Sequence, residues 1–182
     1  MKLLLHICCA PCSIIPLEYY KNENYEVSGY FYNPNIHPIS EHTKRIQTLN
    51  DYSKQIGLNV IYDNEYLEDE WLKLSKDTIR CNFCYQIRLE NVFKYACQFG
   101  YDAVSTSLLI SPYQNHELIK ETCEKLASLY NVKFIYKDFR PLFYEGQNKA
   151  REYGLYRQKY CGCIFSLFER DNLIKIKKEV VK

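Results

Sequence analysis

The chain opens with MKLLLHICCAPC at residues 1–12, and this stretch decides the fold. Residues 2–7 form a short apolar run, which is typical of a strand buried within a parallel sheet. Three cysteines, Cys8, Cys9 and Cys12, follow it directly. A nucleotide-binding sheet would carry a glycine-rich phosphate loop here, but the sequence contains neither GxxxxGK[ST] nor GxGxxG. We therefore expect the end of this first strand to hold a metal rather than a phosphate.

Apolar segments alternate with helical segments along the rest of the chain. Further strands are predicted at residues 25–32, 58–62, 101–109 and 132–136, and helices at residues 13–22, 40–57, 65–75, 89–99, 116–130 and from 164 onwards. Pro16 fits the helix at 13–22 only within its first turn. The alternation predicts an α/β fold, with a parallel sheet and helices on both faces. In such sheets ligands bind beyond the carboxyl ends of the strands, which is where the first cysteine cluster lies.

The composition is that of a folded protein without a membrane segment. With 182 residues, 47% hydrophobic and 25% charged, the chain is expected to form one domain over residues 1–182. The net charge of +2 does not indicate wholesale binding to nucleic acid, although a local basic face remains open. No apolar run is long enough to cross a bilayer and no signal-peptide cleavage site follows the first strand, so we expect a cytoplasmic protein. In a reducing compartment, clustered cysteines indicate metal or redox chemistry.

The nine cysteines fall into three groups and two single residues. The groups are Cys8, Cys9 and Cys12; Cys81 and Cys84; and Cys161 and Cys163, while Cys97 and Cys123 stand alone in helical patterns and are expected to be buried hydrophobes. Two thiolates from the first group and two from the second would complete a four-cysteine site for zinc or an iron–sulfur cluster. The adjacent pair Cys8-Cys9 favours a cluster, because neighbouring side chains in a turn can reach different corners of a larger group. A buried strand end with incidental thiols is the alternative.

The third group, Cys161-Gly162-Cys163, suits electron transfer. Two cysteines one residue apart form a disulfide only in a strained ring, and strain makes the bond easy to reduce. Gly162 removes the Cβ that would obstruct that ring. The pair is therefore interpreted as a two-electron dithiol, with two further metal ligands as the competing interpretation.

Five motifs in order resemble the cobalamin-independent epoxyqueuosine reductases, the QueH family. They are HICCAPC at 6–12, YNPNIHP at 32–38, CNFCYQIRL at 81–89, SLLISPYQ at 107–114 and GLYRQKYCGC at 154–163. The resemblance implies a Rossmann-like fold of the HUP class, related to PP-loop proteins. It implies an oxidoreductase that reduces epoxyqueuosine at the wobble position of the tRNA anticodon loop to queuosine, the last step of queuosine biosynthesis.

The resemblance also implies the site residues and cofactors. The ligands of a 4Fe-4S cluster would be Cys8, Cys9, Cys81 and Cys84, and the redox-active disulfide would join Cys161 and Cys163. An additional iron ion would lie near the cluster, with Cys12 as its contact. The electrons would come from an external donor that the sequence does not identify.

Proton donors and RNA contacts are assigned by residue type and by place. Candidates to protonate the epoxide oxygen are His6, His37, His116 and Asp102, with His6 favoured because it lies two residues before Cys8. Residues next to the motifs are candidates for RNA contacts, namely Tyr113, Gln114, Tyr156, Arg157 and Gln158.

The rival functions are a zinc-stabilised RNA-binding module without catalysis and a thiol–disulfide oxidoreductase that acts on protein partners.

Overall fold

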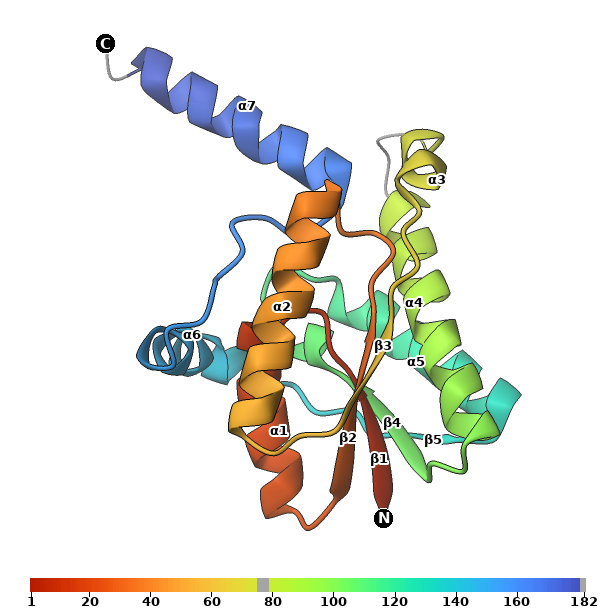
Figure 1. Ribbon diagram of the computed structural model, residues 1–182. Coiled ribbons are helices and arrows are strands. Elements are labelled where there is room, and N and C mark those ends of the chain that lie inside the picture. Colours follow the sequence, from red (N-terminus) through yellow and green to blue (C-terminus); the bar gives the residue numbers. More distant parts are fainter. Residues whose placement is uncertain (75–78, 181–182) are drawn as a thin grey trace.

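Five parallel strands form one sheet in the order β3-β2-β1-β4-β5 (Figure 1). The computed structural model describes residues 1–74 and 79–180. The strands are β1 (Lys2–His6), β2 (Glu26–Tyr32), β3 (Val60–Asp63), β4 (Ala103–Thr106) and β5 (Lys133–Phe134). This parallel sheet is the one predicted from the alternation of segments.

Helices cover both faces of the sheet, as predicted. The helices are α1 (Ala10–Asn22), α2 (Ile39–Gln55), α3 (Glu68–Leu72), α4 (Ile79–Gln98), α5 (His116–Tyr130), α6 (Phe143–Glu152) and α7 (Ile164–Val180), with short 3-10 turns η1 (Ser107–Ile110) and η2 (Arg140–Leu142). In Figure 1, α1, α2 and α6 lie on one side of the sheet and α4 and α5 on the other, while α7 extends away from the body. Among the described helices, none combines the length and the apolar character that crossing a bilayer requires.

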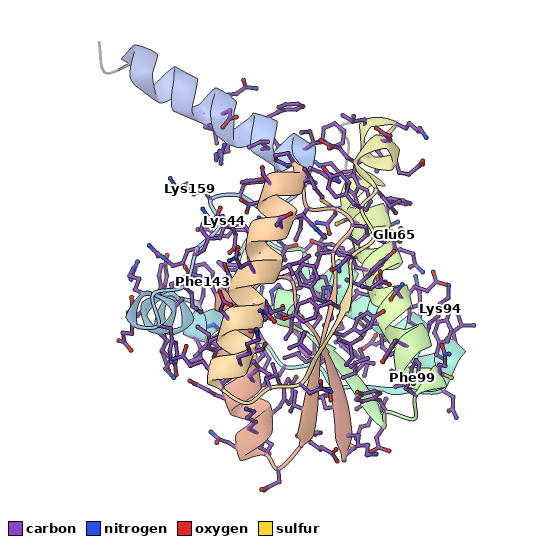
Figure 2. All side chains as sticks on the ribbon, viewed as in Figure 1. Lys44, Glu65, Lys94, Phe99, Phe143 and Lys159 are labelled. Carbon is purple, nitrogen blue, oxygen red and sulfur yellow. The ribbon has the colours of Figure 1, made fainter. Side chains whose placement is uncertain are left out.

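The core is built around β1, the central strand. Its residues Leu3, Leu4 and Leu5 are fully buried, because β2 and β4 flank the strand and helices cover both of its faces. Apolar side chains fill the space between the layers (Figure 2). The continuous apolar run at the start of the chain therefore reflects burial on two faces.

The strand order reverses at β1, and this creates the crevice in which the cysteines lie. The chain leaves β1 through α1 toward β2 and β3, and it returns through α4 to pair β4 with the other edge of β1. The segments that follow β1 and β4 therefore separate at the carboxyl edge of the sheet. Cys8 follows β1 and Ser107 follows β4, so both stand at this switch point.

Several elements differ from the predictions, and the strand predicted at residues 101–109 was too long, because β4 ends at Thr106 and η1 follows it. Helix α1 begins at Ala10, with Pro11 in its first turn, so Pro16 lies in the helix interior and the expectation that it belongs to the first turn was wrong. Helix α4 begins at Ile79, ten residues before the predicted start, which places Cys81 and Cys84 on a helix. The sequence analysis assigned no helix to residues 143–152, where α6 lies.

Gly29 in β2 should not tolerate a larger side chain. A Cβ at this position would lie 2.8 Å from Cδ1 of Ile7 and 3.0 Å from Cγ2 of Val60. We expect Gly29→Val to lower the free energy of unfolding by about 1–3 kcal/mol through overpacking, as measured by urea denaturation. Ser28→Ala, at the half-buried neighbouring position, is the control and should change it by less than about 0.5 kcal/mol. Equal stability of Gly29→Val and the wild type would contradict this packing.

Candidate functional site

The sulfur atoms of Cys8, Cys9 and Cys12 lie within 4.8 Å of one another at the carboxyl end of β1. The Sγ atoms of Cys8 and Cys9 are 3.9 Å apart, so the adjacent side chains turn to the same side. Cys9 is the N-cap of α1, and its sulfur accepts a hydrogen bond of 3.4 Å from the backbone N–H of Cys12. The positive end of the α1 dipole therefore faces a group of thiols, and such a position favours thiolate.

Cys8 is the most acidic thiol of this group, because burial and the neighbouring thiols raise the pKa of Cys9 and Cys12 instead. The neighbouring Cys12 and Cys9 thiols, and then the Ser107 hydroxyl, donate hydrogen bonds that hold the pKa of Cys8 well below its usual range. Ser107 Oγ lies 3.3 Å from Cys8 Sγ and accepts a hydrogen bond of 3.0 Å from the Cys8 backbone N–H. This contact joins the segments after β1 and β4 across the switch point.

The second group, Cys81 and Cys84, lies in the first turns of α4. Cys84 is buried and packs in one apolar cluster with Trp71, Cys163 and Phe165, whereas Cys81 is exposed. Burial raises the pKa of the Cys84 thiol to about 12. Among the described residues, the sulfurs gathered within 4.8 Å do not include those of Cys81 and Cys84.

Arg88 connects the α4 cysteines with the other two groups. Its side chain is buried, and its Nε donates a hydrogen bond of 3.0 Å to the backbone oxygen of Cys84. Its Nη2 is buried without a hydrogen-bond partner among the described atoms. Burial alone would lower the pKa of Arg88, but the nearby thiols of Cys84, Cys161 and Cys8 outweigh it and raise that pKa. A fixed positive charge therefore lies among thiols from all three cysteine groups.

The third group, Cys161 and Cys163, consists of two free thiols. Cys161 Sγ accepts a hydrogen bond of 3.4 Å from Nε2 of Gln114, and Cys163 Sγ lies 3.5 Å from the Ser166 hydroxyl. Gly162 between them has a φ of 147°, and a Cβ there would meet Cγ1 of Ile36 at 3.3 Å. The backbone at this position thus requires glycine.

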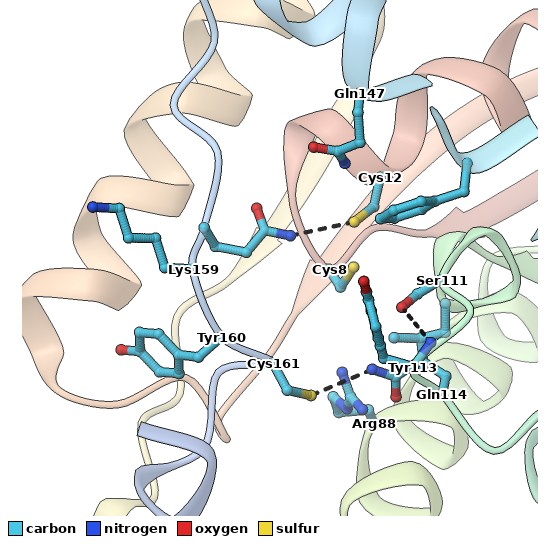
Figure 3. A pocket seen from close by; sticks show the side chains of 13 residues that line it. Cys8, Cys12, Arg88, Ser111, Tyr113, Gln114, Gln147, Lys159, Tyr160 and Cys161 are labelled. Carbon is cyan, nitrogen blue, oxygen red and sulfur yellow. Dashed lines mark hydrogen bonds between the residues drawn. The ribbon is translucent and has the colours of Figure 1, made fainter. Parts of the chain in front are cut away.

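One pocket of about 390 Å³ joins the N-terminal and C-terminal thiols (Figure 3). Its volume falls within the range of about 300–1,000 Å³ that is typical of small-molecule sites. The described residues that line it include two cations and no carboxylate: Cys8, Cys12, Arg88, Leu108, Ser111, Tyr113, Gln114, Phe143, Gln147, Gln158, Lys159, Tyr160 and Cys161. The pocket therefore suits a polar or anionic ligand that reaches the sulfurs.

Two glutamine side chains present their amide groups to the thiols. Nε2 of Gln158 lies 2.9 Å from Cys9 Sγ and 3.4 Å from Cys12 Sγ. Gln114 accepts a hydrogen bond of 2.8 Å from the Tyr85 hydroxyl at Oε1, which turns its Nε2 toward Cys161. Both glutamines were predicted as RNA contacts, and here their amides are engaged with sulfur.

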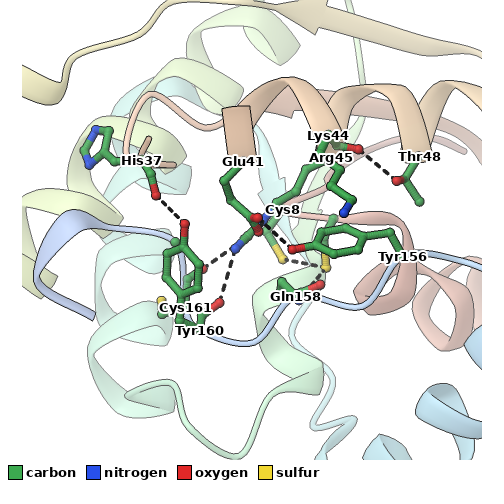
Figure 4. A network of polar contacts seen from close by, with 12 residues as sticks. Cys8, His37, Glu41, Lys44, Arg45, Thr48, Tyr156, Gln158, Tyr160 and Cys161 are labelled. Carbon is green, nitrogen blue, oxygen red and sulfur yellow. Dashed lines mark hydrogen bonds and ion pairs between the residues drawn. The ribbon is translucent and has the colours of Figure 1, made fainter. Parts of the chain in front are cut away.

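A buried ion pair holds the segment that carries Cys161 (Figure 4). Arg45 on α2 donates to Glu41 Oε1 at 2.8 Å, and it also donates to the backbone oxygens of Cys161 at 3.0 Å and Tyr160 at 3.2 Å. The Tyr156 hydroxyl donates to Glu41 Oε2 at 2.7 Å. The sequence analysis missed Arg45 and Glu41, although their spacing of four residues on a predicted helix was a visible signal.

The four predicted proton donors do not line the pocket among the described residues. His37 is fixed by Pro34 O and by the Ile164 N–H, and Asp102 lies at the opposite end of β4, where it accepts a hydrogen bond from the backbone of Lys2. His116 donates a hydrogen bond of 3.1 Å from Nε2 to the backbone oxygen of Ser111. The preference for His6 as the proton donor was wrong, because its side chain is fully buried away from the pocket.

His6 is fully buried, with Nδ1 2.9 Å from the Thr106 hydroxyl and Nε2 3.2 Å from the Tyr32 carbonyl. Burial, and then the Arg88 charge, lowers the pKa of His6 to about 4. The ring is therefore neutral at physiological pH, and both of its nitrogens are engaged by Thr106 and Tyr32 rather than by the pocket. It holds β1, β2 and β4 together at the edge that carries the thiols.

The two isolated cysteines, Cys97 and Cys123, differ in burial. Cys123 is fully buried, as expected of a small hydrophobe, whereas Cys97 near the end of α4 is exposed, so the expectation that it is buried was wrong.

Tyr156, a predicted RNA contact, is packed beneath Lys44, whose Nζ lies 4.0 Å from the ring centroid. Tyr113, another predicted contact, is 80% exposed at the pocket.

A comparison with known protein families finds one family along nearly the whole chain. The family described as Epoxyqueuosine reductase QueH matches residues 3–169. A relative with that description from Dehalococcoides mccartyi is 38% identical over 171 residues, which cover 93% of this chain and 94% of the relative. The relative from Thermotoga maritima is 36% identical over 179 residues, covering 92% of this chain and 91% of its own length.

Solved structures confirm the Rossmann-like fold of the PP-loop kind. The U34-tRNA thiolase NcsA from Methanococcus maripaludis, described with its 4Fe-4S cluster, superposes with a TM-score of 0.59 at 19% identity, over 98% of this chain and 67% of that chain. A "predicted subunit of tRNA methyltransferase" from Methanocaldococcus jannaschii gives a TM-score of 0.52 at 13% identity, over 87% and 93% of the two chains. At these identities the likeness concerns the fold alone.

His6 should titrate far below an ordinary histidine. By NMR on the iron-free protein we expect its pKa near the value of about 4, against about 6.5 in the unfolded chain. As the pH falls, the unfolded chain takes up this proton before the native state does. The free energy of unfolding therefore decreases by roughly 3 kcal/mol through this group between about pH 6.5 and about pH 4. An NMR midpoint near 6.5 would contradict the burial of a neutral ring.

Proposed function

The chain belongs to the family of epoxyqueuosine reductases QueH, and we propose that it reduces the epoxide of epoxyqueuosine in the tRNA anticodon loop to the alkene of queuosine. The family match over residues 3–169 carries this proposal. The pocket supports it, because thiols from two distant parts of the chain line one cavity of about 390 Å³. A nucleoside at the wobble position of a single-stranded loop can be splayed into such a cavity.

The reaction requires two electrons and two protons. Both bonds from carbon to the epoxide oxygen break, a carbon–carbon double bond forms, and the oxygen leaves as water. Cys161 and Cys163 are a matching source, because two thiols that join in a disulfide release two electrons and two protons. An epoxide and a dithiol thus give an alkene, a disulfide and water, and an external donor must then reduce the disulfide.

Cys161 is the thiol of the pair that is presented to the substrate. Its sulfur faces the pocket, and Gln114 Nε2 and the Arg88 charge lie beside it. Cys163 is buried in the apolar cluster behind it, where the Ser166 hydroxyl contacts its sulfur. Gly162 leaves the short connection free of a side chain, so that the two thiols can approach.

Cys8, Cys9, Cys81 and Cys84 are the proposed ligands of an iron–sulfur cluster of the 4Fe-4S type. The donor set fits, since cubane clusters are held by four cysteine thiolates, and the buried guanidinium groups of this site would offset their negative charge. A cubane offers a separate iron corner to each ligand, so its thiolates need not gather as closely as those around a single ion. When bound, a cluster supplies single electrons and a Lewis-acidic iron.

Two further residues would support this cluster. Gln158 donates to the sulfur of Cys9, and hydrogen bonds to ligand sulfur raise the potential of such centres. Cys12, which is left over from the four ligands, is the thiol available to an additional iron ion. The U34-tRNA thiolase NcsA, which carries a 4Fe-4S cluster on a similar fold, is in keeping with the cluster.

The alternative function is a zinc-stabilised RNA-binding module without catalysis. The observation that favours it is the close approach of Cys8, Cys9 and Cys12, because three sulfurs within 4.8 Å could bind a single zinc ion. It leaves the Cys161-Gly162-Cys163 segment without a role.

Cys81→Ser should remove the cluster and the activity together. After anaerobic purification we expect the broad visible absorption to disappear and epoxyqueuosine reduction to fall by at least about 100-fold, because hydroxyl is a poor iron ligand. Cys97→Ser, an exposed cysteine near the other end of α4, is the matched control and should keep both. A Cys81→Ser protein that keeps its colour and turnover would exclude Cys81 as a ligand.

Cys163→Ser tests the dithiol separately from the cluster. We expect the visible absorption to remain and turnover with a chemical reductant to be lost, because a single thiol cannot deliver two electrons. Cys123→Ser serves as the control for a buried thiol outside the pocket, and it should remain active. Full turnover by Cys163→Ser would show that the pair is not the electron relay.

A further inference from the structure

Three aromatic side chains form an exposed step at the pocket. They are Tyr113, after η1, and Phe143 and Tyr144, at the start of α6, and we call them the aromatic step. Tyr113 and Phe143 meet edge to face with ring centroids 5.9 Å apart, and Phe143 and Tyr144 meet edge to face at 5.4 Å. Tyr113 is 80% exposed and Tyr144 is 75% exposed.

The aromatic step is continuous with the cavity that holds the thiols. Tyr113 and Phe143 themselves line that cavity, together with Cys8 and Cys161 (Figure 3). Single exposed aromatics are ordinary on protein surfaces, but three in contact beside a pocket mark a binding surface. A ligand in this cavity therefore lies beside Tyr113 and Phe143, and Tyr144 extends the aromatic surface outside it.

The chemistry around the pocket favours a single-stranded nucleic acid as that ligand. Arg88 and Lys159 line the pocket, and no carboxylate is found among its described lining residues, so its charge complements a phosphodiester. Amide groups of Gln114 and Gln158 point toward the floor. Flat aromatic faces beside a basic pocket are the means by which proteins hold unpaired bases.

With a volume of about 390 Å³, the pocket leaves no room for a strand of several nucleotides, so the nucleotides that flank a nucleoside bound in it must lie outside. We propose that the aromatic step stacks the nucleobases that flank the modified nucleoside of the anticodon loop, an inference that rests on the proposed function. Stacking on Tyr113 and Tyr144 would fix the strand while the epoxide lies at the thiols. Tyr156 cannot serve this purpose, since Lys44 covers its ring and Glu41 holds its hydroxyl.

The direct test is the binding of a fluorescently labelled anticodon stem-loop RNA, measured by anisotropy at several salt concentrations. We expect Tyr113→Ala and Tyr144→Ala each to raise the Kd about tenfold, with an unchanged salt slope because no charge is removed. Tyr113→Phe and Tyr144→Phe keep the ring and should bind like the wild type. Tyr144→Leu keeps bulk without a π face and should bind as weakly as Tyr144→Ala.

Phe99→Ala is the matched control. Phe99 is 56% exposed and lies on the opposite side of the molecule from Phe143 (Figure 2), so its removal should leave the Kd unchanged. Because Tyr113 and Tyr144 face solvent, their truncation should also leave the thermal unfolding midpoint unchanged. Wild-type affinity in both alanine variants would overturn the proposal.

Turnover separates this inference from the proposed function. If the wild type reduces epoxyqueuosine while the alanine variants keep the wild-type Kd and KM, the aromatic step fails and the function stands. If the variants lose RNA affinity but the wild type does not reduce the epoxide, the step stands and the function fails. A loss of turnover confined to assays with a protein electron donor, at unchanged RNA affinity, would instead assign the step to that donor and overturn the proposal.

Discussion

Two buried guanidinium groups connect the cysteines that the chain brings to the pocket. Arg88 holds the backbone of Cys84 and faces thiols of the other two groups, while Arg45 holds the backbone of Cys161 from α2. A buried cation is costly unless negative charge compensates it. Glu41 compensates Arg45, but among the described residues Arg88 forms no ion pair with a carboxylate and has an unpaired Nη2. Cys8, whose pKa is lowered, is the thiol near Arg88 that can supply negative charge, and this balance underlies the proposal of a thiolate-bound cluster.

The fold provides the place where this charge balance can form. The reversal of strand order at β1 opens a crevice between the segments after β1 and β4, and Cys8 and Ser107 meet across it. Nucleotide-binding sheets use the same crevice for phosphates, which helix N-termini and glycine loops hold. Here Cys9 caps α1 with its sulfur, so the helix dipole that would favour a phosphate faces cysteine sulfurs instead. The same architecture thus serves a different anion.

Periodicity predicted the sheet, the two layers of helices and the position of the first cysteine group, because these follow from local apolar patterns. It did not place Cys81 and Cys84 on α4, because residues 79–88 (IRCNFCYQIR) alternate between apolar and polar types over most of their length, which is not the helical period, and Cys84 packs in an apolar cluster with Trp71. Burial in the folded chain explains why the proton donor was predicted wrongly and the ion pair was missed. His6 is neutral because three strands enclose it, and Arg45 matters because a segment more than a hundred residues away lies on it. Neither fact is local in sequence, so residue type alone suggested the wrong proton donors and missed the anchoring ion pair.

We propose that thiols from the N-terminal segment and from α4 hold iron and inorganic sulfide within reach of the Cys161 pocket. The most direct measurement is the content of iron, acid-labile sulfide and zinc in the anaerobically purified wild-type protein, taken together with its visible spectrum. A 4Fe-4S cluster at this site would give a brown protein with about four irons and about four sulfides per chain, or about one iron more if Cys12 binds a further ion. A colourless protein with stoichiometric zinc and no sulfide would contradict it.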